Sequence, residues 1–342
     1  MKHSVADNMK SILIRIVLFL ADIFGLNRLF RSMNSDKIRI LMYHGVSDIK
    51  LPSFYWTLLD RNVFLSQMAY IRKKYNVVGP ESIYAEGNEV RDRVVITFDD
   101  GLLNNYTTVL PILKESNMPA VCFVLPSLSE KNEMMWTDKL YAVLIEDENN
   151  ILDLSGFGLG TWELASDPNR RADNIKKLIY KLKAAPHDKR VVILEYIFND
   201  IAAGNIFDYG VFGLMSPAQI KELSESGHFY IGAHTNSHPI LSTMPASEQE
   251  KEIKGGMDKT AEWGINSIPL FAYPNGRAED FNEETVNILK QYDFKAALTT
   301  IDGLHDPADD KYRIKRINIG ADTGKWEFRA RLSGLFYFLQ GK

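Results

Sequence analysis

Short apolar runs alternate with longer stretches of helical periodicity in the first third of the chain. The apolar runs occupy residues 38–43, 94–98 and 120–125, and they are short and rich in β-branched residues. Such runs are typical of buried strands. The stretches between them, residues 61–75 and 106–116, have the length and pattern of helices. This alternation predicts an α/β fold, in which crossover helices connect the strands of a parallel sheet.

The alternation stops between about residues 127 and 215. A glycine-rich segment, Gly156-Phe-Gly-Leu-Gly160, separates helix-like pieces in this region. We therefore interpret residues 127–215 as a helical subdomain inserted into a larger domain that covers residues 37–342.

The N-terminal region has a different pattern. Residues 12–30 are mostly apolar, but Arg15 and Asp22 interrupt them. The uninterrupted apolar stretch is therefore much shorter than the ~20 residues that a membrane-spanning helix needs. Ser11 shares one side of the predicted helix with these two charged residues, which gives an amphipathic helix with a narrow polar stripe.

We interpret residues 1–36 as an amphipathic segment that lies in a membrane interface, because basic residues flank its apolar part. Two alternatives stay open. The helix could pack on the main domain, or it could be an atypical signal sequence. The apolar C-terminal stretch, residues 326–339, could pair with this segment or cap the core.

Composition narrows the class of protein. A chain of 342 residues with 45% hydrophobic and 25% charged content can bury a large core. The formal net charge of −4, with no long basic block, argues against nucleic acid as a partner. The single cysteine, Cys122, excludes an internal disulfide and lies in an apolar run, so we expect it in the core.

Candidate chemistry follows the second predicted strand. Asp99 and Asp100 come directly after residues 94–98, at the strand end where α/β folds keep their functional groups. Far downstream, His234 and His238 follow another probable short strand. One carboxylate and two imidazoles suit a hydrolytic Zn²⁺ or a similar divalent ion, which leaves the other carboxylate to handle a proton. Taken alone, the Asp-Asp-Gly sequence could be a turn, and the histidines a solvated helix face.

These motifs resemble those of the polysaccharide deacetylases of the NodB-homology type. The Thr-Phe-Asp-Asp-Gly and His-Thr-x-x-His sequences match in order and spacing, and residues 271–276 are similar to the Arg-x-Pro-Tyr-Gly loop of the family. The resemblance spans about residues 38–320. It implies a distorted (β/α) barrel with fewer regular strands than the standard eight. We expect the inserted subdomain to lie near the rim of the active site.

The resemblance also implies residue roles. Asp99 would be the general base, and the metal ligands would be Asp100, His234 and His238. A backbone N–H of the third motif would stabilise the developing oxyanion, although a tight structural turn is the competing account. This loop consists of Tyr273, Pro274, Asn275 and Gly276.

One family residue is absent from its usual place. The third motif of the family begins with an arginine that holds the base carboxylate, but Ala272 stands at this position. Arg316 could reach the carboxylate from a neighbouring strand, and the sequence leaves this open.

The general acid also lacks its usual place. The family carries a Leu-x-His segment on its last strand, and no such segment directly follows the Gly276 loop. Leu41-Met-Tyr-His44 is similar to that segment but stands at the front of the chain. Because a closed barrel can be opened between different strands, a circular permutation would still place His44 beside Asp99. We predict that His44 protonates the leaving amine, with His305 as the rival; a loop histidine satisfied by a hydrogen bond is the alternative.

The sequence thus predicts a metal-dependent hydrolase that removes N-acetyl groups from a polysaccharide or glycan, with Zn²⁺ as the first candidate ion. We expect a glycan or glycolipid substrate and contact of the N-terminal helix with a membrane surface. The location stays open between the bacterial cell envelope and the cytoplasmic face of a membrane. Two alternative functions remain: a deformylase of a lipid-linked formamido sugar, and a catalytically silent carbohydrate-binding barrel.

Overall fold

A computed structural model describes residues 3–52, 55–85, 90–146, 150–201 and 210–341. The strands are β1 (Arg39–Tyr43), β2 (Gly45–Ser47), β3 (Leu58–Asp60), β4 (Asn76–Val77), β5 (Arg93–Phe98), β6 (Ala120–Val124), β7 (Ile151–Leu154), β8 (Gly160–Glu163), β9 (Phe229–Ala233), β10 (Leu270–Ala272), β11 (Ala296–Asp302) and β12 (Ile314–Asn318).

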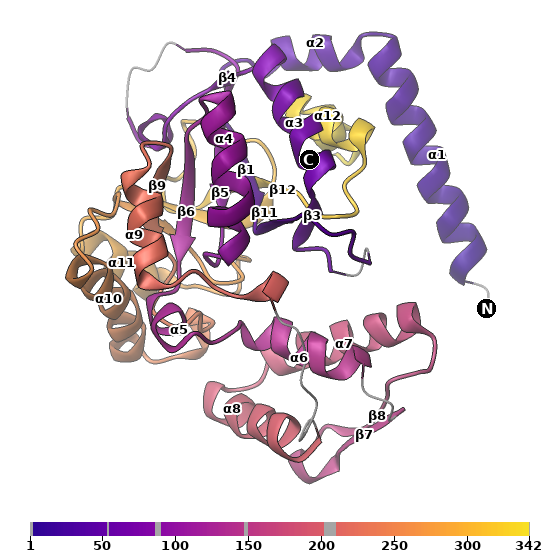
Figure 1. Ribbon diagram of the computed structural model, residues 1–342. Coiled ribbons are helices and arrows are strands. Elements are labelled where there is room, and N and C mark those ends of the chain that lie inside the picture. The colour runs from indigo at the N-terminus through magenta and orange to yellow at the C-terminus, as the bar shows by residue number, and fades with distance from the viewer. Residues whose placement is uncertain (1–2, 53–54, 86–89, 147–149, 202–209, 342) are drawn as a thin grey trace.

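The α-helices surround these strands (Figure 1). They are α1 (His3–Ile23), α2 (Leu26–Met33), α3 (Arg61–Lys74), α4 (Leu110–Ser116), α5 (Pro126–Lys131), α6 (Trp136–Glu146), α7 (Pro168–Lys183), α8 (His187–Tyr196), α9 (Pro217–Glu225), α10 (Ala246–Glu262), α11 (Glu283–Gln291), α12 (Lys325–Ser333) and α13 (Leu335–Leu339).

Seven parallel strands form a closed barrel. The order in the sheet is β1-β12-β11-β10-β9-β6-β5-β4, and β1 also pairs with β5, which closes the ring and leaves β4 outside it. The closing pair is in parallel register from Arg39 opposite Val94 to Tyr43 opposite Phe98. Every residue of β1, β5 and β6 is buried, as expected for strands covered on both faces. The expected (β/α) barrel with fewer than eight strands is confirmed.

One predicted helix is divided. The stretch predicted at residues 106–116 begins with a π-helical turn, η2 (Asn105–Val109), which continues into α4. Pro111 lies in the first turn of α4 and has no N–H to donate to the residue four positions earlier. The register of helical hydrogen bonds therefore changes just before this proline.

The region between β6 and β9 has its own apolar core. It comprises α6, the antiparallel pair β7–β8, α7 and α8, with Leu144, Leu178 and Ile193 among its buried side chains. The glycine-rich segment forms the connection of β7 and β8, a hairpin that the sequence analysis did not predict. In Figure 1 this layer lies below the barrel, on the side toward which the β6 arrow points. The domain boundaries at residues 36, 127 and 215 stay predictions.

The two ends of the chain pack together beside the barrel. Leu18 and Ala21 of α1 are buried against Ala330 and Leu335. Asp22 pairs with Arg329 at 2.5 Å. The C-terminal helices also close the main core, because Phe328 and Leu332 belong to it. The C-terminal stretch therefore both pairs with the N-terminal helix and caps the core.

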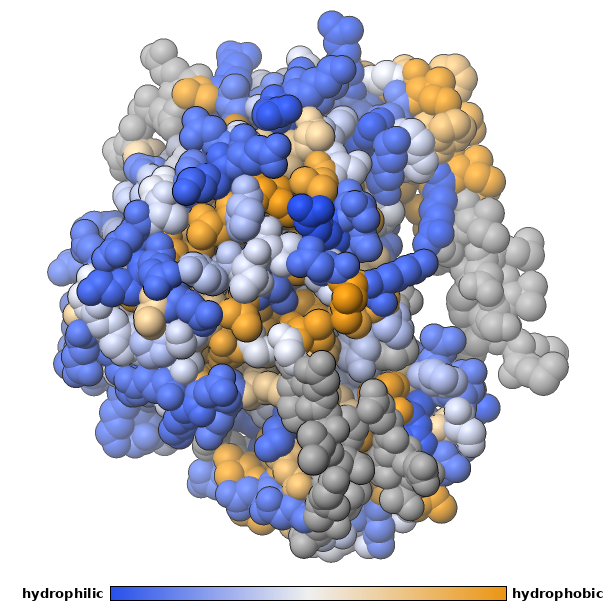
Figure 2. All heavy atoms as spheres, viewed as in Figure 1, coloured by the Kyte–Doolittle hydropathy of each residue, from blue (hydrophilic) through white to orange (hydrophobic). Residues whose placement is uncertain are grey.

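The opposite side of these terminal helices is apolar and exposed. Figure 2 shows apolar side chains over the upper part of α1, at the right edge of the molecule. A search of the described helices finds none with the length and hydropathy of a membrane span. We call this surface the terminal apolar face; its exposed members are Leu13, Ile16, Val17, Leu20, Ile23, Phe24, Leu26, Leu29, Met33, Phe338 and Leu339.

Candidate active site

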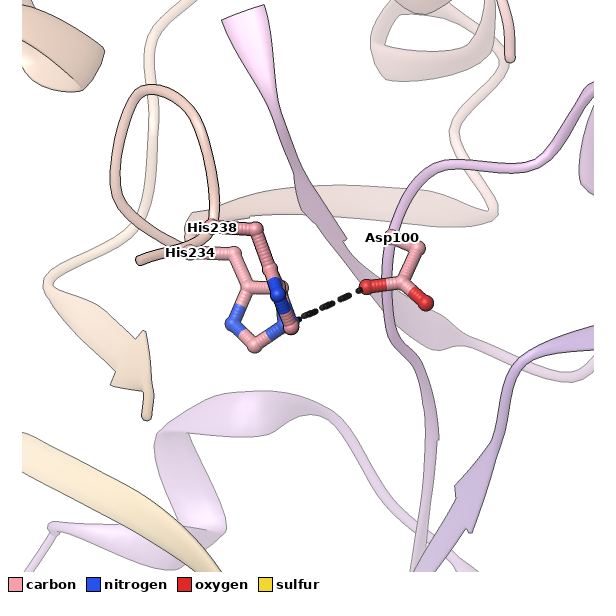
Figure 3. A group of neighbouring side chains, drawn as sticks. All are labelled: Asp100, His234 and His238. Carbon is pink, nitrogen blue, oxygen red and sulfur yellow. Dashed lines mark ion pairs between the residues drawn. The ribbon is translucent and has the colours of Figure 1, made fainter. Parts of the chain in front are cut away.

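The three predicted metal ligands meet at the C-terminal rim of the barrel. Asp100 follows β5, and both His234 and His238 follow β9 (Figure 3). Asp100 Oδ1 lies 3.4 Å from His234 Nε2 and 3.6 Å from His238 Nε2. One ligand atom from each residue can be chosen so that all three lie within 4.8 Å of one another. The cluster therefore has the compactness that a shared ion requires.

The donor atoms of this cluster are in the state that a divalent ion needs. Burial lowers the pKa of His238 to about 3, so its imidazole is neutral at pH 7. Burial alone would raise the pKa of Asp100, but the close approach of His234, together with His238 and His44, outweighs it and holds this pKa well below its usual range. Asp100 Oδ1 is buried and has no hydrogen-bond partner among the described residues. A carboxylate oxygen without a partner, facing two imidazoles, fits a hard or borderline cation.

The His-Thr-x-x-His segment is a buried loop and not the solvated helix face that was the alternative. Thr235 and His238 have positive φ angles of 67° and 63°, a region that costs non-glycine residues about 1–3 kcal/mol each. Glu252 of α10 holds this loop, because its carboxylate accepts hydrogen bonds from the backbone of Asn236 and from Ser237. His234 Nδ1 lies 2.6 Å from the carbonyl oxygen of Ala272, which fixes the ring with Nε2 toward Asp100.

Asp99 is held by a guanidinium. Both carboxylate oxygens of Asp99 accept hydrogen bonds from Arg316 of β12, at 2.8 and 2.7 Å. Arg316 is fully buried, and its Nε donates to the carbonyl oxygen of Thr299. Burial raises the pKa of Asp99, but the charge and hydrogen bonds of Arg316 outweigh it, so the pKa is lowered and the carboxylate stays ionised. Arg316 thus makes the contact that Ala272 cannot make.

His44 lies at the same rim, and His305 does not. His44 directly follows β1 and lines one cavity with Asp99, Asp100 and His234. Burial lowers the pKa of His44, although both carboxylates counteract this effect. His305 forms a β-bridge with the residue that precedes β1, so it lies at the opposite end of the barrel from the site.

The loop after β10 both stabilises the fold and lines the cavity. The Tyr273 ring stacks on Phe281 with 3.9 Å between centroids, and its hydroxyl donates to the carbonyl oxygen of Tyr312. A Cβ at Gly276, where φ is 64°, would lie 2.8 Å from the backbone nitrogen of Thr300. Asn275 also has a positive φ, and its backbone N–H donates to none of the described residues. Tyr273 and Asn275 line the cavity, so the loop is a tight turn at the site, and it contains a backbone N–H without an acceptor among the described residues.

The cavity has a volume of about 390 Å³, and its second wall comes from the inserted layer. Side chains of α6 and α7 line this wall. They were not predicted, because the amino-acid sequence carries no local signal for how these helices pack on the barrel. Asp138 is one of them, and burial together with the charge of Asp100 raises its pKa to about 7. Lys183 of α7 donates a hydrogen bond to the side chain of Asn275. The wall residues are Trp136, Thr137, Asp138, Tyr141, Lys176, Ile179 and Lys183.

Two buried carboxylates, three imidazoles and a free backbone N–H on the rim of a (β/α) barrel define a hydrolytic site. The family model of polysaccharide deacetylases matches residues 86–297. The chain belongs to the polysaccharide deacetylase family, and it is a hydrolase that deacetylates a carbohydrate polymer. The match is shorter than the resemblance at residues 38–320 and leaves out His44 and Arg316.

Solved structures share the fold. A deacetylase of Streptococcus pyogenes, PplD in complex with acetate, is 19% identical, with 87% of this chain and 99% of that chain covered and a TM-score of 0.57. IcaB from Ammonifex degensii is 18% identical, with 87% and 97% covered and a TM-score of 0.55. A de-N-acetylase from Aggregatibacter actinomycetemcomitans is 18% identical, with 86% and 100% covered and a TM-score of 0.53. A search of curated protein sequences gave no match.

The buried pair of Arg316 and Asp99 generates the first prediction. Arg316→Gln should lower the free energy of unfolding at pH 7 by about 3–5 kcal/mol, because it leaves a buried carboxylate without its counter-ion. Arg313→Gln, which breaks exposed ion pairs, is the control and should cost less than about 1 kcal/mol. Urea denaturation measures both.

The stability that Arg316→Gln loses depends on pH in a predictable direction. The pKa of Asp99 is depressed in the folded state, so the pair contributes stability above the unfolded pKa and loses it as the pH falls through the folded pKa. The difference between wild type and Arg316→Gln should therefore narrow in acid. A difference that is small at pH 7, or that grows in acid, would contradict the assigned pair.

Proposed function

We propose that this deacetylase is metal-dependent and hydrolyses N-acetyl groups of a glycan, with a divalent ion held by Asp100, His234 and His238. The observation that carries the proposal is the buried Asp100 Oδ1, which has no hydrogen-bond partner among the described residues and faces two imidazole Nε2 atoms. Zn²⁺ is the first candidate, because a carboxylate and two imidazoles are a common ligand set of hydrolytic zinc. The bound ion would polarise the acyl carbonyl and acidify a water molecule.

The remaining roles fall to side chains and backbone at the same rim. Asp99 accepts a proton from the attacking water, and Arg316 keeps the carboxylate ionised and oriented for this step. The N–H of Asn275 donates to the oxyanion that develops on the acyl carbon. His44 protonates the departing amine. Because burial keeps the resting imidazole neutral, His44 has to gain this proton during turnover, and the two adjacent carboxylates favour its charged form.

The metal proposal predicts that some variants lose metal affinity and that another loses only turnover. His234→Ala and His238→Ala should each lower metal affinity about 10-fold or more, because each removes a ligand that no neighbouring side chain replaces. Asp99→Asn should retain the metal but lose turnover, because the amide keeps the shape and cannot accept a proton. Elemental analysis of purified protein and acetate release measure the two effects. Full metal occupancy in both histidine variants would contradict the ligand assignment.

The general acid is tested by a pair of histidines at opposite ends of the barrel. His44→Ala should retain metal and substrate binding but lower kcat by about 10²–10⁴-fold, the usual contribution of a positioned proton donor. His305→Ala is the control and should change kcat little, because this residue lies away from the cavity. Steady-state kinetics on one acetylated substrate decide between them, and a large loss in His305→Ala alone would reverse the assignment.

We also propose that the terminal apolar face lies on an anionic bilayer surface. A continuous apolar face of this extent is unusual on a soluble monomer. On α1 its members recur every three or four residues, as in helices that lie in a membrane interface. Charge supports the same partner, because Arg15 and Arg28 are exposed whereas Asp22 is turned inward and paired with Arg329. Deformylation of a lipid-linked sugar is therefore the second candidate reaction, and assays of released formate and acetate separate the two.

Membrane contact is tested at two exposed apolar residues of the terminal apolar face, one in α1 and one directly after it. The double variant Leu20→Glu, Phe24→Glu should reduce binding to vesicles of phosphatidylcholine and phosphatidylglycerol by about 10-fold or more, because two exposed apolar anchors are lost. Val192→Glu, which alters an exposed apolar residue of the inserted layer, is the control. Vesicle co-sedimentation measures the effect. Equal binding by the double variant, or a dimer that the double variant dissociates, would contradict the membrane assignment.

A further inference from the structure

The inserted layer gives the cavity a basic wall. Lys176 and Lys183 lie seven residues apart on α7, which places them on one face of the helix, and both line the cavity. Arg277, which follows the Asn275 loop of the barrel, lines the cavity with them. Neither carboxylate of the barrel rim is the partner of these three cations. Asp99 is paired with Arg316, and Asp100 faces the proposed ion.

The two lysines have no carboxylate partner in the described part of the chain. No described carboxylate lies within 4.0 Å of Lys176 Nζ or Lys183 Nζ, whereas many surface lysines and arginines of this protein are paired. Arg277 has a loose exposed partner, Glu279, at 3.9 Å. Asp138 is the one carboxylate that the described inserted layer adds to the cavity. The inserted layer therefore contributes two lysines and one aspartate to the cavity, and Arg277 of the barrel adds a third cation beside them.

Lys183 also lies close to the proposed chemistry. Its Nζ donates a hydrogen bond to the side chain of Asn275, which lines the cavity and whose backbone N–H is the proposed oxyanion donor. An ammonium group has three donors, so two N–H groups remain for a ligand. A group held by Lys183 would therefore lie next to the acyl group that is hydrolysed.

We propose that Lys176, Lys183 and Arg277 bind an anionic group, a phosphate or a carboxylate, carried by the N-acyl sugar or by its neighbour. This inference rests on the proposed function, because it names the class of glycan that the same site accepts. A neutral polymer would leave the half-buried Lys183 without a carboxylate in ion-pair contact, whereas an anionic substituent supplies charge-assisted hydrogen bonds to it. The wall thus selects acidic or phosphorylated N-acyl glycans over neutral ones.

Binding of small sugars to the zinc-loaded protein tests the inference. The probes are N-acetylglucosamine 1-phosphate, N-acetylmuramic acid and the neutral methyl N-acetylglucosaminide, with Kd measured by calorimetry. We expect one of the anionic sugars to bind about 10- to 100-fold more tightly than the neutral one, the value of one or two charge-assisted hydrogen bonds. The two anionic probes distinguish a phosphate from a carboxylate.

Variants then test whether the two lysines cause the preference for anionic sugars. Lys183→Gln and Lys176→Gln should each reduce the ratio of the two Kd values, whereas Lys181→Gln, an exposed lysine of the same helix that does not line the cavity, should leave it unchanged. Equal binding of neutral and anionic sugars by the wild type would overturn the inference. A preference that persists in both lysine variants would also overturn it, because the anion would then contact the metal ion instead.

Acetate release measured in the same samples separates this inference from the proposed function. Acetate release without an anionic preference would remove the inference and leave the proposed function intact. An anionic preference that the lysine variants abolish, in a protein that releases no acetate, would retain the anion site and remove the proposed function.

Discussion

The parallel pairing of β1 with β5 is the constraint on which the rest of the site depends. It places Tyr43 opposite Phe98, and the Asp99 N–H donates to the carbonyl oxygen of Tyr43. The residues that follow, His44 after β1 and Asp99 and Asp100 after β5, therefore emerge at one rim. The same closure fixes β12 on the other side of β1, and β12 carries the guanidinium that binds Asp99. If the barrel were open at this seam, the proposed base after β5 would lie on one side of the sheet, and the proposed acid and the orienting arginine, on β1 and β12, would lie on the other.

The negative charges of the two adjacent buried carboxylates are compensated in different ways. Asp99 has a bidentate partner within the chain, so its charge is compensated before any ligand arrives. Asp100 retains a buried oxygen without a partner, so its full compensation depends on a cation from outside. Neighbours with nearly the same burial thus acquire different chemistry, one suited to accept a proton and one suited to bind an ion.

The sequence was sufficient wherever the signal was local. Short apolar runs located β1, β5 and β6 within one or two residues, and a carboxylate or histidine directly after a strand indicated the rim. The sequence suggested Arg316 as a partner of Asp99 but could not decide it, because this contact depends on the position of β12 around the barrel. The basic wall was missed for the same kind of reason. The helical pattern of α7 predicts a helix, but which of its faces meets the cavity is set by tertiary packing. The hairpin β7–β8 was missed because the sequence of β7, Ile-Leu-Asp-Leu, does not alternate between apolar and polar residues, although its exposure in the structure does.

The permuted strand order stays an interpretation, although β1 lies beside β5 as that interpretation requires. The family match begins after β1 and ends before β12, so β5 of the seam lies inside the match, whereas β1 and its other neighbour, β12, lie outside it. The proposed acid and the arginine that orients the proposed base both come from these segments. The account therefore places part of the catalytic machinery outside the matched region.

The central claim is that one divalent ion binds at the rim beside Asp99 and His44. Anomalous diffraction at the zinc absorption edge, from crystals grown with Zn²⁺, tests it most directly. The account predicts a single strong peak in this cavity, coordinated by the Asp100 carboxylate and the Nε2 atoms of His234 and His238. Crystals that contain zinc elsewhere but show no peak between these three side chains would contradict the account.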